Sequence, residues 1–292
     1  MLNLSAKLNL WLKSFEARFE AVQTTLYCEP QSLHQACRYA LGGQGKRTRP
    51  LLVMAAAEAC GSRPEDALSL AVAVEMIHTY SLVHDDLPTM DDDEMRRGRA
   101  TTHIIYDEAT ALLAGDALLT DAFLVIADDH ELAADIRANA VLHLARASGG
   151  QGMVKGQALD MHWTGLGGFT QVDLDTIHLN KTGALIAASC TLGGLAARAS
   201  AGDLKRLDAF GRGLGLVFQI IDDVLDAEEG TGKSVGKDAD AGKLTYMSLM
   251  SAAGAKQYAK SLTDDTLSLI APWGDRGEAL RELALALVDR KL

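Results

Sequence analysis

The sequence has few of the residues that interrupt helices, cross-link small domains or bind polyanions. It contains only five prolines, and its four cysteines are scattered with no CxxC pair, which argues against a small domain held together by disulfides. The net charge is −11 and no basic run occurs, so a nucleic-acid backbone or an anionic membrane surface would be repelled. Residues 1–20 lack the continuous apolar segment of a signal peptide, and no apolar run approaches the ~20 residues needed to span a bilayer. We therefore expect a cytoplasmic protein with no membrane span and no nucleic-acid partner.

Alanine- and leucine-rich stretches lie between the prolines, with apolar residues at intervals of three and four, and this pattern predicts an all-α fold. The expected helices cover roughly residues 5–24, 32–41, 49–60, 65–87, 107–127, 131–148, 170–198, 203–228, 245–260 and 276–290. Four segments are apolar nearly all round, namely 65–87, 107–127, 181–198 and 203–225, and should lie at the centre of a helical bundle. Since 48% of the residues are apolar and no linker, low-complexity tract or repeat is apparent, we expect one domain over residues 1–292.

Two clusters of aspartate follow apolar helical segments and are the most informative feature of the sequence. The first is DDLPTMDDD at residues 85–93, and the second is DDVLD at residues 222–226. Paired acids are usually solvated surface groups or helix caps, as we expect for Asp128 and Asp129 in their polar surroundings. Burying several carboxylates beside interior segments requires a counter-charge, and Mg²⁺ suits them best because it prefers oxygen ligands and keeps positions for phosphate oxygens. The expected ligand is therefore a phosphate ester.

The spacing within each cluster bears on whether its carboxylates can share a metal. Asp222 and Asp226 are four residues apart, so they share one face of a helix. Asp85 and Asp91 would diverge on a continuous helix, but the proline between them is expected to end or bend the helix and let Asp91 fold back towards Asp85. His78 lies seven residues, or two turns, before Asp85 and should face the same side.

Basic residues that could hold phosphates occur as short groups in expected loops. They are GKRTRP at residues 45–50, RRGR at residues 96–99 and three lysines between residues 233 and 243. Their placement beside the acid clusters of a net-acidic protein favours phosphate binding over surface decoration. The sequence GTGKS at residues 230–234 resembles the end of a nucleotide P-loop, but Ala227 replaces the required first glycine and a helix precedes it, which argues against an ATPase.

Seven motifs, in the expected order and over nearly the whole chain, resemble those of the trans-isoprenyl diphosphate synthases, particularly the bacterial farnesyl diphosphate synthase (geranyltranstransferase) type. The matching motifs are GKRTRP (45–50), MIHTYSLVHDD (76–86), RRG (96–98), GDALL (115–119), GQALD (156–160), KTG (181–183) and FQIIDDVLD (218–226). The loop at Gly43, Gln44 and Gly45 departs from the usual pattern by its extra length, which bears on how Lys46 and Arg49 are set.

The resemblance implies an all-α bundle of the isoprenoid-synthase type around a deep central cavity, commonly a homodimer, holding about three Mg²⁺ ions between the two acid clusters. The metal ligands it implies are Asp85, Asp86, Asp91, Asp222, Asp223 and Asp226. The residues it assigns to the allylic diphosphate are Arg96, Lys181, Gln219, Lys233 and Lys243. Those it assigns to isopentenyl diphosphate are Lys46, Arg49, His78 and Arg97. The Lys181 carbonyl and the Thr182 and Gln219 side chains would stabilise a carbocation, so the implied catalytic set is Asp85, Asp91, Arg96, Lys181, Thr182, Gln219 and Asp222.

The implied activity is a Mg²⁺-dependent prenyl transfer: head-to-tail condensation of isopentenyl diphosphate with dimethylallyl or geranyl diphosphate gives farnesyl diphosphate and pyrophosphate. Tyr80, five residues or about 7.5 Å before Asp85 on the helix, resembles with Ser81 the floor that stops chain growth, although Tyr80 could also simply fill the core. Geranyl or geranylgeranyl diphosphate, or a C10/C15/C20 mixture, stays open as the product. A terpene cyclase is disfavoured by Asp226 and the basic pair Lys46 and Arg49, and a non-catalytic prenyl synthase subunit by the retained acids and arginines.

Overall fold

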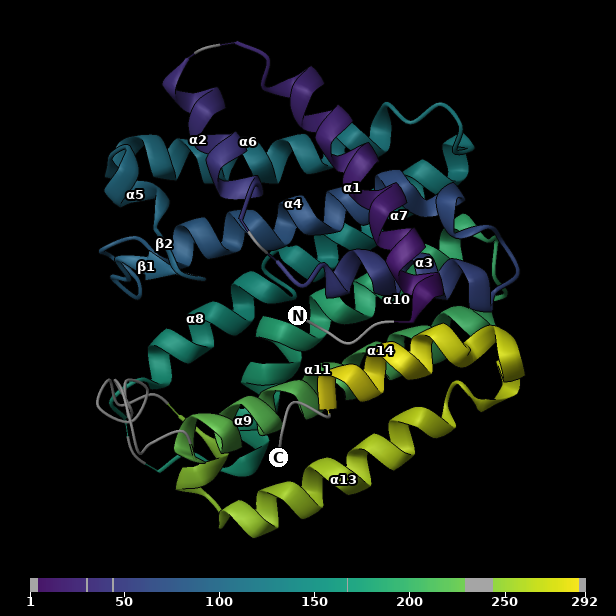
Figure 1. Ribbon diagram of the computed structural model, residues 1–292. Coiled ribbons are helices and arrows are strands. Elements are labelled where there is room, and N and C mark those ends of the chain that lie inside the picture. Colours follow the sequence, from purple (N-terminus) through teal and green to yellow (C-terminus); the bar gives the residue numbers. More distant parts are fainter. Residues whose placement is uncertain (1–4, 30, 44, 167, 229–243, 289–292) are drawn as a thin grey trace.

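A computed structural model describes residues 5–29, 31–43, 45–166, 168–228 and 244–288, and over these ranges the protein is an all-α bundle, as predicted (Figure 1). Its α-helices are α1 (Ala6–Leu26), α2 (Ser32–Leu41), α3 (Thr48–Ala59), α4 (Leu68–Asp85), α5 (Thr102–Ile105), α6 (Glu108–Ala127), α7 (Ala134–Ser148), α8 (Met153–Trp163), α9 (Gln171–His178), α10 (Ala184–Ala196), α11 (Ala201–Glu228), α13 (Ala252–Ser268) and α14 (Glu278–Val288). Short 3₁₀ helices lie at Pro64–Ala67, Tyr246–Ser248 and Ala271–Gly277, and a π-helical turn at Leu179–Gly183 joins α9 to α10.

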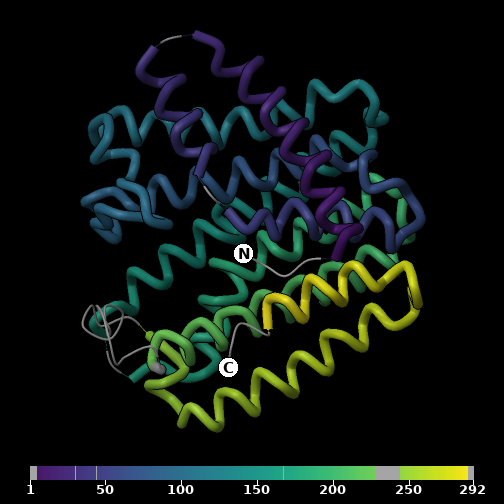
Figure 2. Tube along the Cα trace, in the orientation of Figure 1, coloured from purple at the N-terminus to yellow at the C-terminus, as the bar shows by residue number. Residues whose placement is uncertain are grey.

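Two buried helices, α4 and α10, organise the bundle. α4 runs alongside α6 and also packs against α3 and α1, whereas α10 packs against α3, α7 and α11 (Figure 1). Figure 2 shows α13 and α14 along one side of the bundle, where both contact α11. Because α4 and α11 end in the two aspartate clusters, the central packing brings both clusters to one region of the fold.

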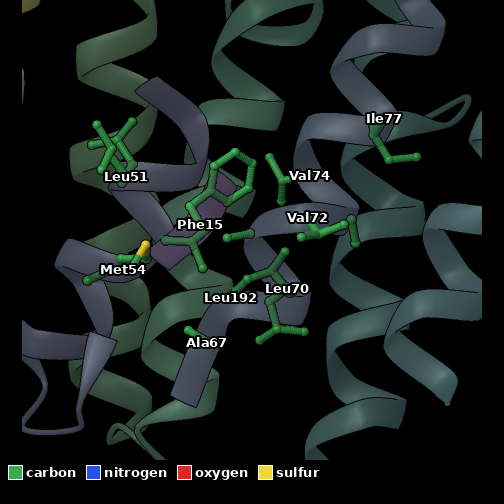
Figure 3. Packing of buried hydrophobic residues seen from close by; sticks show 14 of the residues in the cluster. Phe15, Leu51, Met54, Ala67, Leu70, Val72, Val74, Ile77 and Leu192 are labelled. Carbon is green, nitrogen blue, oxygen red and sulfur yellow. The ribbon is translucent and has the colours of Figure 1, made fainter. Parts of the chain in front are cut away.

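The largest apolar core lies where α1, α3, α4 and α10 meet. Figure 3 shows Phe15 of α1 between Leu51 and Met54 of α3 and Val74 of α4, with its ring directed towards Val74, and Leu192 of α10 belongs to the same cluster. All five side chains are fully buried. Fully burying one such side chain contributes about 1.5–3 kcal/mol, so this core fixes the direction of α4 and hence the position of the residues at its end.

Two of the segments predicted to be buried are both long and strongly apolar in the structure. Pro64–Asp85 and Glu108–Ala127 are long and apolar enough, by length and composition alone, to cross a membrane, so the expectation that no such run exists was wrong on that criterion. The first is 72% buried inside the protein, as is typical of a core helix in a soluble protein, and the second is 39% buried. Packing against other helices therefore explains most of the apolar character of the first segment and part of that of the second.

The structure differs from the sequence-based expectations in several places. α8 was not predicted, the helix expected over 170–198 is divided by the π-helical turn, and the helix expected over 245–260 begins only at Ala252. A hairpin was also missed: β1 (Met95–Arg96) pairs antiparallel with β2 (Arg99–Ala100) across a turn at Arg97 and Gly98, both with positive φ. Two successive left-handed residues give the turn that matches the twist of a short hairpin.

Candidate active site

A cavity of about 760 Å³ lies between α4, α8, α10 and α11 and extends to the start of α3 and the hairpin. Its volume is within the usual range for small-molecule sites. Among the described residues it is lined by twelve of those singled out in the sequence: Lys46, Arg49, His78, Tyr80, Ser81, Asp85, Arg96, Arg97, Lys181, Thr182, Gln219 and Asp222. Residues far apart in the sequence thus meet on one cavity.

The first aspartate cluster turns back on itself, as the sequence predicted. α4 ends at Asp85, and the backbone N–H of Asp91 donates to the carbonyl of Asp85 at 2.9 Å. Asp92, with a φ of 52°, lies in the same turn, where its N–H donates to the carbonyl of Leu87. Pro88 cannot continue the hydrogen bonding of α4, so the chain folds over the end of the helix. Asp85 lines the cavity, and Asp91 is held within a few ångströms of it by the backbone.

Asp86 forms an ion pair with Arg96. Its buried carboxylate accepts a hydrogen bond from Arg96 Nε at 2.5 Å, and Asp93 lies 3.5 Å from the same guanidinium. Burial raises the pKa of Asp86 to about 6, although Arg96 opposes the rise. Asp86 lines a small second cavity behind the hairpin, of about 60 Å³, whereas Arg96 lines both cavities. The pair therefore holds Arg96 at the edge of the main cavity.

The second cluster lies at the end of α11, where Gln219 and Asp222 line the cavity. Thr182 Oγ1 donates to Gln219 Oε1 at 2.7 Å, so the amide nitrogen of Gln219 keeps its two donors for other partners. Asp223 instead accepts a hydrogen bond from the backbone N–H of Tyr246 at 2.8 Å, and Asp226 is exposed. Asp223 and Asp226 are outside the cavity lining in the described part of the chain.

The π-helical turn presents Lys181 and Thr182 to the cavity. Such turns add one residue to a helix and are frequent at functional sites. Lys181 Nζ lies 2.6 Å from the carboxylate of Asp160 on α8. α8 can approach this closely because residue 156 is a glycine: a Cβ there would lie 2.0 Å from the backbone nitrogen of Lys181. Asp160, which belongs to the GQALD motif but was not assigned a role, therefore positions Lys181.

The opposite end of the cavity is basic. Lys46, Arg49, His78 and Arg97 all line it, and Arg49 Nε is buried without a hydrogen-bond partner among the described residues. Burial lowers the pKa of Arg49 to about 10, which still leaves the guanidinium charged at neutral pH. Burial and the neighbouring arginines lower the pKa of His78 well below its usual value, so its imidazole is neutral. A buried guanidinium with a free donor favours an anionic ligand.

Tyr80 lies on α4 between the basic and acidic ends of the cavity. Its side chain is only 5% exposed, and its ring packs edge-on against His84 with the centroids 5.8 Å apart. Burial raises the pKa of its hydroxyl to about 12. Apolar side chains continue the wall beside it, among them Met153, Ile186 and Phe218. This part of the cavity suits a hydrocarbon chain.

The described donor set fits Mg²⁺ only with help from a ligand. Within the described residues, no three His, Cys, Asp or Glu side chains gather closely enough to hold a metal ion by themselves. Asp85 and Asp222 nevertheless supply carboxylate oxygens to the same cavity. Mg²⁺ usually takes one or two carboxylates from a protein and its other ligands from water and phosphate oxygens. The two lysines assigned to the allylic diphosphate, Lys233 and Lys243, are outside the described residues.

Comparison with known proteins agrees with this geometry. Residues 30–269 match the polyprenyl synthetase family. The chain is 47% identical to the farnesyl diphosphate synthase of Geobacillus stearothermophilus over 82% of this chain and 84% of the relative, and 40% identical to the geranylgeranyl diphosphate synthase of Cyanophora paradoxa over 98% of each. Its fold matches the crystal structure of a Helicobacter pylori geranyltransferase complexed with magnesium and isoprenyl diphosphate, with a TM-score of 0.82, 32% identity, and coverage of 98% of this chain and 97% of that one. The all-α bundle is thus of the isoprenoid-synthase type, and the chain belongs to the polyprenyl synthetase family.

Proposed function

We propose that this chain is a prenyltransferase that condenses isopentenyl diphosphate head-to-tail with dimethylallyl and then geranyl diphosphate, giving farnesyl diphosphate and pyrophosphate. The observation that carries the proposal is one cavity with three chemically different parts: carboxylates at Asp85 and Asp222, cations at Lys46 and Arg49, and an apolar wall at Tyr80. Two diphosphates and one growing hydrocarbon need these three environments together. Residues 1–292 act in this proposal as one polyprenyl synthetase domain.

The allylic diphosphate binds at the acidic end. Asp85, Asp91 and Asp222 would be the leading ligands of Mg²⁺ there, about three ions in all, with Asp86, Asp223 and Asp226 as further or water-mediated ligands. When bound, Mg²⁺ neutralises the negative charge that develops on the departing pyrophosphate. The Lys181 ammonium, which is paired with Asp160 in the structure, would also stabilise the charge on pyrophosphate. Arg96 supplies a second cation from the hairpin. Lys233 and Lys243 are expected to join them.

The carbon chemistry needs no side-chain nucleophile. The allylic C–O bond breaks with its electron pair leaving on pyrophosphate, and the double bond of isopentenyl diphosphate attacks the allylic cation to form the new C–C bond. The released pyrophosphate then removes the proton that restores a double bond. The Lys181 carbonyl and the Thr182 and Gln219 oxygens direct negative dipoles at the cation. Apolar walls exclude the water that would quench it.

Isopentenyl diphosphate binds at the basic end, to Lys46, Arg49, His78 and Arg97. Neutral His78 donates or accepts a hydrogen bond there without adding charge. Tyr80 and Ser81 close the hydrocarbon part of the cavity and limit growth to C15. A geranylgeranyl product is the second candidate, because a relative that matches 98% of the chain carries that name.

Exposed apolar side chains on α5 and α6 support the proposal of a homodimer. The side chains of Ile104, Ile105, Leu112, Leu113 and Leu124 are each about half exposed. Contiguous apolar side chains on one surface are typical of association sites. The surface also explains why the most apolar part of α6 is only 39% buried. Sedimentation of the wild type and of Leu113→Lys tests this assignment, and a monomeric wild type would refute it.

One incubation tests the function. The purified protein is supplied with Mg²⁺, isopentenyl diphosphate and either dimethylallyl or geranyl diphosphate, and the products are identified by mass spectrometry. A C15 diphosphate is expected, Asp222→Asn should lower the rate at least ~100-fold, and Asp129→Asn, a matched surface change, should not. A hydrocarbon made without isopentenyl diphosphate would instead indicate a cyclase. Absence of turnover by a folded wild type would indicate a binding subunit.

A further inference from the structure

The basic end of the cavity contains a buried carboxylate that should oppose the binding of an anion. Glu75 lies on α4 one turn before His78, lines the cavity, and is only 3% exposed. Its Oε1 atom accepts a hydrogen bond from Arg47 Nη1 at 2.7 Å. A negative charge beside a diphosphate site needs a reason, since it costs desolvation and repels the ligand.

Each of the three guanidinium nitrogens of Arg47 donates a hydrogen bond to the protein. Its Nε donates to Glu16 at 2.9 Å, its Nη1 to Glu75, and its Nη2 to the carbonyl of Leu41 at 3.3 Å. The guanidinium also lies over the ring of Phe19, with 4.9 Å from its carbon to the ring centroid. Three of its five N–H donors are thus bound to protein acceptors, although Arg47 borders the cavity.

The hydrogen bonds of the Arg47 side chain hold a residue whose backbone conformation is unfavourable. Arg47 is the residue immediately before α3 and has a φ of 48°, a left-handed conformation that is unfavourable for a residue with a side chain. Its neighbours Lys46 and Arg49 both line the cavity. The hydrogen bonds of the Arg47 side chain therefore maintain an unfavourable turn, and the turn directs Lys46 and Arg49.

The packing around Gly45 shows how closely the charges are assembled. A Cβ at residue 45 would lie 2.8 Å from Arg97 Nη1, 3.3 Å from Arg47 Nη1 and 3.4 Å from Glu75 Oε1. Glu75 also favours the charged form of both Arg49 and Arg97, against the burial that opposes it. One carboxylate thus lies among three guanidinium groups, of which Arg47 is bound to it directly and Arg49 and Arg97 remain for the ligand.

We propose that Glu75, acting through Arg47, is the positioning residue of the isopentenyl diphosphate site: it holds the turn at residues 45–49 so that Lys46 and Arg49 point into the cavity. This inference rests on the proposed function, since it names the residue that shapes one of its two diphosphate sites. It also predicts whether removing the Glu75 charge strengthens or weakens diphosphate binding. If Glu75 acted only through its charge, removing the charge would strengthen diphosphate binding; as a positioning residue, its removal weakens binding.

The test is Glu75→Gln, which keeps the shape and one acceptor oxygen but removes the charge. We expect the KM for isopentenyl diphosphate to rise roughly tenfold or more, since a charge-assisted hydrogen bond is lost, with the KM for geranyl diphosphate and kcat changing about twofold or less. Glu20→Gln is the matched control. Glu20 lies on α1, the helix that carries Glu16, and forms an exposed ion pair with Arg38 of α2. The KM values of this variant should equal those of the wild type.

A second variant separates positioning from stability. Arg47→Met/Glu75→Leu removes both charges of the buried pair, so the folded state is expected to keep a melting temperature near that of the wild type. Its KM for isopentenyl diphosphate should nevertheless stay raised, because the turn has lost its hydrogen bonds. A merely structural pair predicts a normal KM in this folded double variant.

Direct binding keeps the inference testable if turnover fails. Calorimetric titration of isopentenyl diphosphate into the wild type and Glu75→Gln, without allylic substrate, should show roughly tenfold weaker binding by the variant. Equal or tighter binding by a folded Glu75→Gln protein, or an equal rise in both KM values, overturns the inference. A wild-type protein that binds isopentenyl diphosphate but forms no product would overturn the proposed reaction. The role of Glu75 would then be decided by the binding comparison alone.

Discussion

Replacing Gly156 with alanine should damage both the stability and the activity of this protein. The new Cβ would lie 2.0 Å from the nitrogen and 2.4 Å from the Cα of Lys181, and 2.7 Å from the carbonyl carbon of Asn180. These are backbone atoms, so no side-chain rotation relieves the collision. An ordinary contact needs 3.4 Å or more, and α8 and the π-helical turn must therefore move apart by about 1.4 Å.

The displacement acts on the residues that we place at the reacting centre. Asp160 lies four residues after Gly156 on the same face of α8, so the movement also separates it from Lys181, whose Nζ is now 2.6 Å away. Overpacking of this kind costs about 1–3 kcal/mol, and the melting temperature of a domain of this size falls about 2–4 °C per kcal/mol. A misplacement of about 1 Å can lower a rate about 100-fold.

Calorimetric melting and steady-state prenyl transfer check this prediction. Gly150→Ala is the control, because a Cβ at residue 150 meets nothing within 4 Å. It should melt and turn over like the wild type. If Gly156→Ala shows the melting temperature and kcat of the control, the close approach of α8 to Lys181 is not required, and the reasoning is refuted.

Three further predictions follow from single contacts. Tyr80→Ala removes the buried ring beside His84 and should extend the product to C20 or beyond, since each additional CH₂ buried in the opened space contributes about 0.8 kcal/mol; mass spectrometry of the product decides, and unchanged C15 output would contradict a role in chain length. Thr182→Val removes the donor to Gln219 and should lower kcat about tenfold, whereas Thr182→Ser should retain most of it; equal rates for both variants would show that the bond is unimportant. His178 is buried against Tyr246 with a pKa lowered to about 4, so as the pH falls below about 6.5 the unfolded chain takes up a proton first and stability is lost down to about pH 4. His178→Phe should therefore gain about 2 kcal/mol of unfolding free energy relative to the wild type between pH 7 and pH 5, as measured by urea denaturation, and a constant difference would contradict the assigned pKa.

Periodicity predicted the helices that bury a continuous apolar surface. The expected segments 65–87 and 107–127 correspond to α4 and α6, with ends that differ by three residues at most, because their burial depends on a repeat visible in the sequence itself. α8 was missed for the opposite reason. Gly149, Gly150 and Gly152 directly precede it and Gly156 lowers the helix propensity within it, and Gly156 is required by the approach of Lys181 from another part of the chain. A glycine that is needed for a contact with a distant part of the chain is therefore mistaken for a helix breaker when only its sequence neighbours are considered.

The sequence predicted which residues form the candidate site more completely than it predicted which of them contact one another. The motifs identified the acids and cations that line the cavity, but not that Asp86 is bound to Arg96 or that Asp160 holds Lys181. Pairing partners of this kind are set by three-dimensional packing. Glu75 did leave a signal: it is a lone acid in the apolar run AVAVEMI, and a buried acid in such a run must have a cation near it.

The two ends of the cavity are related through one rigid helix. His78 at the basic end and Asp85 at the acidic end are seven residues apart on α4, and both line the cavity. Seven residues span about 10.5 Å and return to nearly the same face, whereas six or eight residues would rotate one group about 100° away. Because the core fixes α4 along its whole length, this separation cannot adapt to the substrate. In the proposed reaction, the distance between the two diphosphate groups is therefore set by the sequence spacing of residues 78 and 85 on α4.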